Sequence, residues 1–161
     1  MLTHPLMRRP IAVCLASFCL LATAAVAEEP GGLVAGSFGE QPLEMAIAPD
    51  LSAATIIGTY ADASLSGMLT EGGEETVFLT LMLSGELPEP EELMLEIAFA
   101  RDMGANWRGD GESLTLELSD FSVSDGIVSL SGTVTGEVKG GPFLETRPVT
   151  LSFDALLEQV N

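Results

Sequence analysis

Histidine and cysteine are scarce in this chain of 161 residues, which has one histidine and two cysteines. All three residues, His4, Cys14 and Cys19, lie near the N-terminus. The rest of the chain offers no imidazole and no thiol, which excludes a Ser-His-Asp triad, thiol catalysis and the usual ligand sets for zinc, copper, haem and iron–sulfur clusters. Disulfides are excluded as well, so burial of apolar surface has to stabilise the fold.

The N-terminal segment predicts a secretory signal peptide over residues 1–27. Arg8 and Arg9 precede an apolar run from Ile11 to Leu21, and Ala25-Val26-Ala27 supplies an A-x-A cleavage site. The apolar run is shorter than the roughly 20 residues that a membrane-spanning helix needs. We therefore expect cleavage after Ala27 and a periplasmic or secreted product, the alternative being a short N-terminal anchor that stays attached.

Basic residues are also few, with six Lys and Arg against 24 Asp and Glu. Removal of residues 1–27 leaves every carboxylate but only four basic residues, which gives a formal charge of −20 over 134 residues. Such a surface repels nucleic-acid phosphates and anionic lipid headgroups, because proteins bind both with Lys and Arg. We expect no nucleic-acid partner. The acidity is typical of a soluble exported protein, or alternatively of a surface that binds cations or a basic partner.

Apolar residues recur with a period of two along most of the chain, which indicates β-strands. The clearest stretch runs from Val128 to Val138, where Val, Leu and Gly alternate with Ser, Thr and Glu. Between Thr76 and Leu83 both alternating sets are apolar, as expected of a central strand covered on both faces. Alternation also marks residues 43–48, 93–99, 114–119 and 149–154.

Turn sequences separate these segments at intervals of about ten residues. Examples are Asp110-Gly111, Asp125-Gly126 and Gly140-Gly141-Pro142. Short, evenly spaced strands predict an all-β fold: a single antiparallel β-sandwich of about eight to ten strands, with a small closed β-barrel as the alternative. We assign residues 33–161 to this one acidic domain and residues 28–32 to a flexible leader. The tail from Asp154 to Val160 fits either a helix or a last strand.

Carboxylates are the abundant reactive groups, and a pair of them can hydrolyse a glycosidic bond. Sugar sites also need aromatic faces, for which Tyr60 and Trp107 are the candidates. Calcium, which binds oxygen ligands, is a further hypothesis. Neither acidic loop of the chain has the spacing of a D-x-D-x-D-G calcium motif, so we interpret these side chains as solvated turn residues and expect no cofactor. The two loops carry Asp110 and Glu112, and Glu71, Glu74 and Glu75.

Residues 101–111 hold the only tryptophan of the chain and two of its basic residues. Trp107, Arg108 and Arg101 are therefore the candidate binding residues, because Trp and Arg commonly anchor interfaces. The alternative, which we favour, is that Trp107 closes one end of the core while the two arginines neutralise neighbouring carboxylates.

No motif in the chain specifies an activity. The composition favours a non-catalytic binding or structural module that contacts a protein or small ligand through sheet edges or through the Trp107 segment. The alternative is a carboxylate-based glycoside hydrolase or a calcium-dependent carbohydrate-binding module. A concave site with converging Asp and Glu side chains and a strongly raised carboxyl pKa would favour the alternative, and a convex surface with evenly spread acids would favour the first function.

Overall fold

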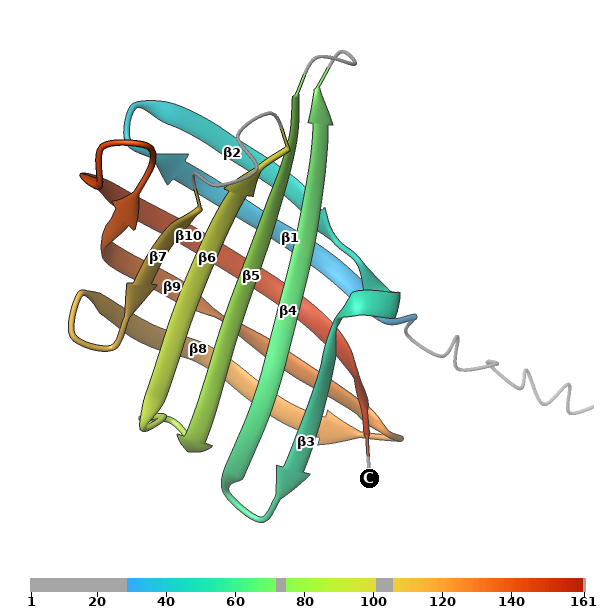
Figure 1. Ribbon diagram of the computed structural model, residues 1–161. Coiled ribbons are helices and arrows are strands. Elements are labelled where there is room, and N and C mark those ends of the chain that lie inside the picture. The colour runs from blue at the N-terminus through green and yellow to red at the C-terminus, as the bar shows by residue number, and fades with distance from the viewer. Residues whose placement is uncertain (1–28, 72–74, 101–105, 161) are drawn as a thin grey trace, which may run out of the picture.

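The computed structural model describes residues 29–71, 75–100 and 106–160, and nearly all of them form β-strands (Figure 1). The predicted signal peptide at 1–27 and the candidate residue Arg101 lie outside these ranges. Within them no helix has the length and apolar character needed to cross a membrane. The elements are β1 (Gly31–Phe38), β2 (Gln41–Ile47), the 3-10 turn η1 (Pro49–Leu51), β3 (Ala53–Ile57), β4 (Tyr60–Glu71), β5 (Glu75–Glu86), β6 (Glu92–Phe99), β7 (Trp107–Asp110), β8 (Leu114–Ser124), β9 (Ile127–Gly140) and β10 (Glu145–Gln159).

The strands form one hydrogen-bonded sheet that closes into a ring. Consecutive strands pair in antiparallel fashion except β2 with β3 and β7 with β8, and β10 returns to pair with β1. Two short bridges of two residue pairs each, β2–β4 and β7–β9, complete the ring. β3 continues β2 along β4, and β8 continues β7 along β9. The chain is thus an up-and-down meander in which two of the strands are interrupted.

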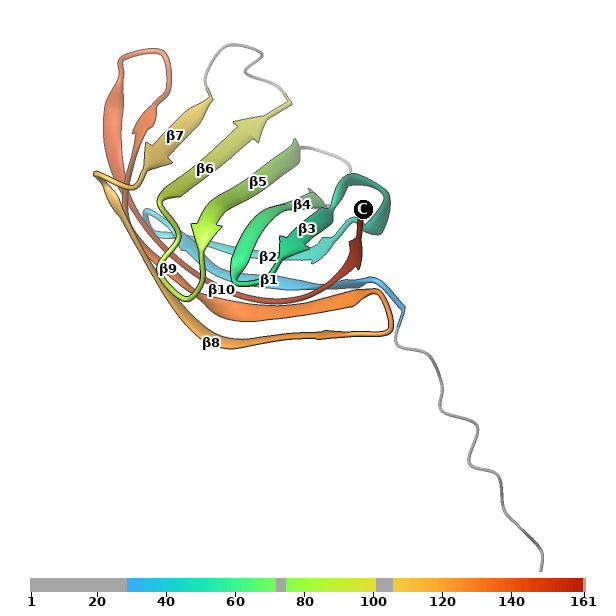
Figure 2. The same cartoon turned by 90° about the horizontal axis from the view of Figure 1, so that it is seen from below.

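The ring is flattened into two facing layers (Figure 2). One layer contains β3 to β7, and β1, β2, β8, β9 and β10 make up the other. The predicted all-β class is confirmed: the layers face each other as in a sandwich, and the sheet is closed as in the alternative architecture. Two details differ from expectation. β3 pairs with β10 in parallel, and Gly31 and Gly32, assigned to the flexible leader, already belong to β1.

Alternating side chains of the strands fill the space between the layers. Every second residue of β9 from Val128 to Val134 is buried, as the sequence pattern predicts, and the tail continues as β10. The prediction that Thr76–Leu83 is covered on both faces is wrong. The inward set of β5 is buried, but Phe78 is 44% exposed and Met82 is 36% exposed. β5 lies in a layer whose outer face is not covered by any described element.

Polar turns redirect the chain where the two strands are interrupted. Between β2 and β3, the Ser66 amide donates to Ser52 Oγ at 2.9 Å and the Ala48 amide donates to the Ser66 carbonyl at 2.7 Å. Between β7 and β8, the Ser113 amide donates to the Asp110 carbonyl at 2.9 Å. At the first turn the chain exchanges β1 for β10 as a neighbour, and at the second turn it leaves β6 while it stays paired with β9.

Leu130→Ala tests the assignment of the core. Leu130 is 1% exposed, so its truncation leaves a cavity between the layers and should lower the free energy of unfolding by about 2–5 kcal/mol. Thr135→Ala, on the exposed face of the same strand, is the matched control and should change it by less than about 0.5 kcal/mol. Urea unfolding followed by circular dichroism measures both, and equal effects would contradict the assignment.

Candidate functional site

Trp107, the first candidate binding residue, points into the core at the start of β7. Its side chain is 4% exposed and meets the Phe38 ring edge-to-face with 5.1 Å between ring centroids. Phe38 in turn lies 5.7 Å from Phe99, centroid to centroid. These three rings fill one end of the space between the layers, which is the arrangement that we favoured from the sequence.

Arg147 of β10 covers this aromatic cluster. Its guanidinium carbon lies 4.5 Å from the centroid of the Trp107 ring and 5.2 Å from that of Phe38, so the cation contacts the π-faces of both rings. Glu145 accepts a hydrogen bond from Arg147 at 3.4 Å. From the sequence we expected Arg101 and Arg108 to neutralise carboxylates near Trp107, and we identified no cation that stacks on the indole. The arginine that stacks on Trp107 comes instead from the far end of the chain.

The turn after β9 accommodates the indole because it contains Gly141. A Cβ atom at this position would lie 2.8 Å from the Trp107 ring, and the residue has a φ of +72°. Both the space and the left-handed backbone conformation therefore require glycine. The predicted Gly140-Gly141-Pro142 turn is present, and Trp107 packs directly beneath it.

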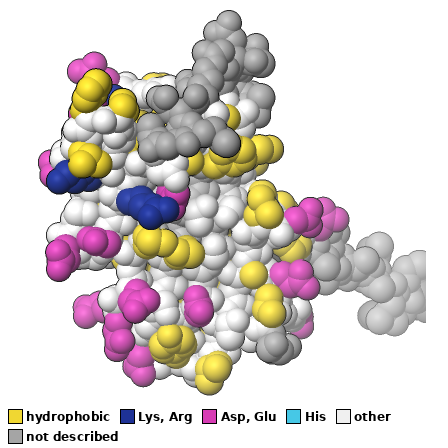
Figure 3. Space-filling view, viewed as in Figure 1, with side chains coloured by type: hydrophobic (Ala, Val, Ile, Leu, Met, Phe, Trp, Pro, Cys, Tyr) yellow, Lys and Arg dark blue, Asp and Glu magenta, His cyan; other side chains and the backbone are white. Residues whose placement is uncertain are grey.

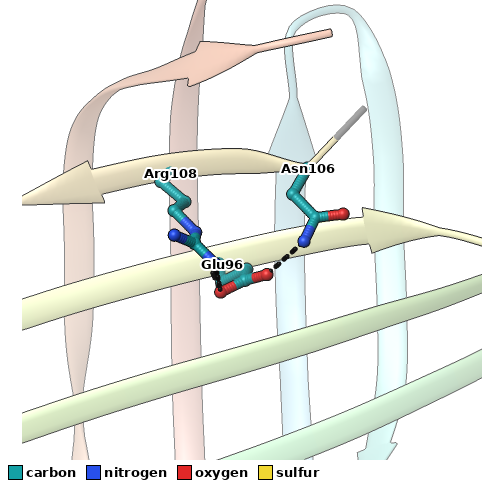
Figure 4. A network of polar contacts seen from close by, with 3 residues as sticks. All are labelled: Glu96, Asn106 and Arg108. Atoms are coloured by element: carbon teal, nitrogen blue, oxygen red, sulfur yellow. Dashed lines mark hydrogen bonds and ion pairs between the residues drawn. The ribbon is translucent and has the colours of Figure 1, made fainter. Parts of the chain in front are cut away.

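Arg108, the second candidate, points to the opposite face of the sheet. Its guanidinium lies 3.0 Å from Glu96 Oε2, and Asn106 Nδ2 donates to Glu96 Oε1 (Figure 4). The Arg108 side chain is 64% exposed, so this pair contributes little to stability. Because Trp107 and Arg108 are adjacent in a strand, they cannot share one recognition surface, and Trp107 is not available to a ligand.

The same outer face contains a hollow of about 700 Å³. Its base is a cross-strand row in which Met82 lies opposite Met94, and Met94 lies opposite Asp110. Directly opposite side chains of this kind have Cβ atoms about 5 Å apart. Figure 3 shows hydrophobic and acidic side chains on the lower half of this face.

A second cross-strand row borders the hollow. Ser84 lies between Asp62 and Glu92, and the Ser84 hydroxyl is 2.8 Å from that of Tyr60. The described residues that line the hollow include no basic and no aromatic side chain. Its carboxylates are Asp62, Glu91, Glu92, Asp110 and Glu112. The floor of the hollow is thus formed by methionine side chains, and its rim is formed by negatively charged carboxylates.

Of the two acidic loops considered for calcium, the structure describes the one that carries Asp110 and Glu112. No group of three or more His, Cys, Asp or Glu side chains in the described part of the chain is placed to hold a metal ion. Asp110 Oδ1 instead accepts a hydrogen bond from the Glu112 amide at 3.1 Å. Glu74 lies outside the described residues, as do the side chains of Glu71 and Glu75.

Comparison with protein-family models, with curated proteins and with solved structures found no match for this chain. The geometry of the hollow is therefore the best guide to the function of this protein. From the sequence, Asp110 and Glu112 were candidate calcium ligands that we interpreted as solvated turn residues, and the outward pair of methionines was not identified. Met82 and Met94 each lie between two leucines, so a local pattern gives no sign that these two side chains face outward together.

Trp107→Ala should lower the free energy of unfolding by about 3–5 kcal/mol, because it empties the end of the core beneath Arg147. Arg108→Ala, one residue further on, removes only an exposed ion pair and should cost less than about 1 kcal/mol. Thermal and urea unfolding measure the two variants side by side. A small effect of Trp107→Ala would contradict a structural role for the indole.

Proposed function

We propose that this protein is an exported, non-catalytic binding module that recognises a cationic group carrying an apolar portion. The observation that carries the proposal is the hollow on the outer face of β4 to β7, where an outward pair of methionines lies among five carboxylates. Its volume of about 700 Å³ lies within the range of about 300–1,000 Å³ that is common for ligand pockets.

The negative charge of the hollow determines that the ligand should carry a positive charge. Five carboxylates without a basic side chain among the described lining residues attract a cation and repel an anion. Arg108, the basic residue of the adjacent strand β7, is already paired with Glu96. The strongly acidic composition of the whole chain adds a long-range attraction in the same direction.

The methionines determine which apolar shapes fit. Met82 is 36% exposed on a face that strands usually cover with polar side chains, and Met94 beside it is half-buried. Methionine is flexible and polarisable, and for this reason it is common on surfaces that accept partners of varied shape. The pair therefore offers an adaptable apolar base for an aliphatic or aromatic group, while the rim binds its positive charge.

The hollow is concave and acidic, as a carboxylate-based hydrolase would also require, but its other features favour binding. Carbohydrate sites stack sugars on aromatic rings, and no described lining residue is aromatic. Trp107 is buried under Arg147, and Tyr60 lies outside the lining with its hydroxyl bonded to Ser84. One rim carboxylate, Asp110, is engaged in the β7–β8 turn.

Export is part of this proposal and is supported by the sequence of residues 1–27. The segment has the charged, apolar and small-residue order of a secretory signal. The chain beyond it has no cysteine, and its fold is stabilised by a closed sheet. N-terminal sequencing of the exported protein should find Glu28 as the first residue.

Glu92→Lys tests the binding function with the amidated hexapeptide Arg-Leu-Arg-Leu-Arg-Leu as the probe. The substitution places a cation at the rim of the hollow and should weaken binding at least tenfold, or about 1.4 kcal/mol, in isothermal titration calorimetry. Met82→Ser should weaken it as well, because the apolar contact is lost.

Glu44→Lys is the matched control for this experiment. Glu44 is an exposed residue of β2 outside the hollow, so the change in net charge is the same but the rim stays intact. Its affinity for the probe should stay within about twofold of the wild type. Equal losses in Glu44→Lys and Glu92→Lys would mean that the peptide senses only the overall charge, and the proposed site would be wrong.

A further inference from the structure

The turn between β9 and β10 exposes two large apolar side chains. Phe143 is 83% exposed and Leu144 is 70% exposed, and Phe143 is the most exposed large apolar residue in the described part of the chain. Figure 1 shows this turn at the upper left, where it projects beyond the ends of the neighbouring strands. We call residues 141–144 the tip. Exposed aromatic and aliphatic pairs of this kind are typical of interface anchors.

The tip is held in one conformation. β9 and β10 are paired up to Gly140 and Glu145, and the Leu144 amide donates to the Gly141 carbonyl at 3.2 Å. Leu144 has a φ of +53°, in the left-handed region that bulky residues rarely adopt. Gly141 at the other end of the turn packs on Trp107. The apolar pair is therefore presented rigidly, so little conformational entropy is lost when a partner binds it.

Basic side chains flank the tip in a chain that has few of them. Lys139 is exposed near the end of β9, and the Arg147 side chain is 43% exposed near the start of β10. The described ranges contain three basic residues, and these are two of them. Arg147 is paired with Glu145 at 3.4 Å, so Lys139 is the basic side chain beside the tip for which the described residues show no ion pair. The tip thus combines an apolar end with the positive charge of Lys139, whereas the hollow has an apolar floor and a negatively charged rim.

We propose that the tip of one copy of this chain docks in the hollow of a second copy. This inference rests on the proposed function, because it identifies the cationic, apolar ligand of the hollow. Phe143 and Leu144 would contact Met82 and Met94, and Lys139 would lie against the carboxylate rim. Because this ligand is a second copy of the chain, it is available wherever the protein is present.

One copy cannot fill its own hollow. Gly140, the residue immediately before the tip, pairs with Trp107 at the first residue of β7. The hollow includes Asp110, the last residue of β7. The tip and the hollow therefore lie at opposite ends of this strand. Each copy offers one tip and one hollow, so copies associate head to tail into a ring or an open chain.

The combined variant Phe143→Ser and Leu144→Asn tests the docking by sedimentation velocity near 0.15 M salt, where long-range repulsion between acidic copies is screened. Both side chains are exposed and Asn tolerates the left-handed conformation, so the melting temperature should not fall. The wild-type protein should form dimers and larger species as its concentration rises. The tip variant should associate at least tenfold more weakly, and Ile57→Ser, which removes an exposed apolar side chain elsewhere, should behave as wild type.

A mixture of two variants tests the tip and the hollow independently. The tip variant keeps an intact hollow, and Glu92→Lys keeps an intact tip. Each alone should be monomeric, and a mixture should give a 1:1 dimer and nothing larger, because only one productive contact remains. Association that persists in the tip variant, or that is lost in the tip variant but kept in Glu92→Lys, overturns the proposal.

Two further outcomes overturn self-docking. A wild-type protein that stays monomeric, while the Arg-Leu hexapeptide still binds and Glu92→Lys still weakens it, disproves self-docking and leaves the proposed binding function intact. A monomeric wild type that binds phosphatidylcholine vesicles through the tip, as shown by loss of binding in the tip variant, assigns the tip to a lipid surface instead. Failure of the hexapeptide to bind, in contrast, counts against the function of the hollow itself.

Discussion

Closure of the sheet is the constraint on which the rest of this structure depends. The chain beyond the predicted signal has no cysteine, so the apolar side chains between the layers have to be kept from water by the strands alone. Two bridges of two residue pairs each, β2–β4 and β7–β9, join the layers at their edges. Both bridges occur where a strand is interrupted, and the polar turns at these points let the backbone change partners without leaving a described buried side-chain polar atom unpaired.

The closed arrangement divides the side chains into two sets with different roles. Inward residues form a continuous core that ends in the rings of Trp107 and Phe38 under the Arg147 cation. Outward residues of β4 to β7 do not fill the core, and in our proposal the methionines and carboxylates among them bind the ligand. The β7 strand shows this division within two residues, because Trp107 completes the core and Arg108 lies on the outer face with Glu96.

Sequence periodicity predicted the strands well because a period of two is a local property of an extended backbone. It placed Val128 to Val134 correctly, whereas the core position of Trp107 was expected from the composition of residues 101–111 and not from periodicity. It failed for Thr76–Leu83, where apolar residues on both faces suggested cover on both sides. Alternation identifies which residues share a face, but whether another layer covers that face depends on contacts distant in sequence. Phe78 and Met82 are exposed for this reason.

By itself the sequence determined the all-β class, the positions of most turns and the absence of imidazole and thiol chemistry beyond the N-terminal segment. Only the tertiary structure decided that Arg147 stacks on Trp107, that the strands close into one ring, and that Met82, Met94 and five carboxylates meet in a hollow. The reason is physical. Local pattern follows from the geometry of a single strand, whereas these contacts join residues from different strands and depend on which strands pair and in which register.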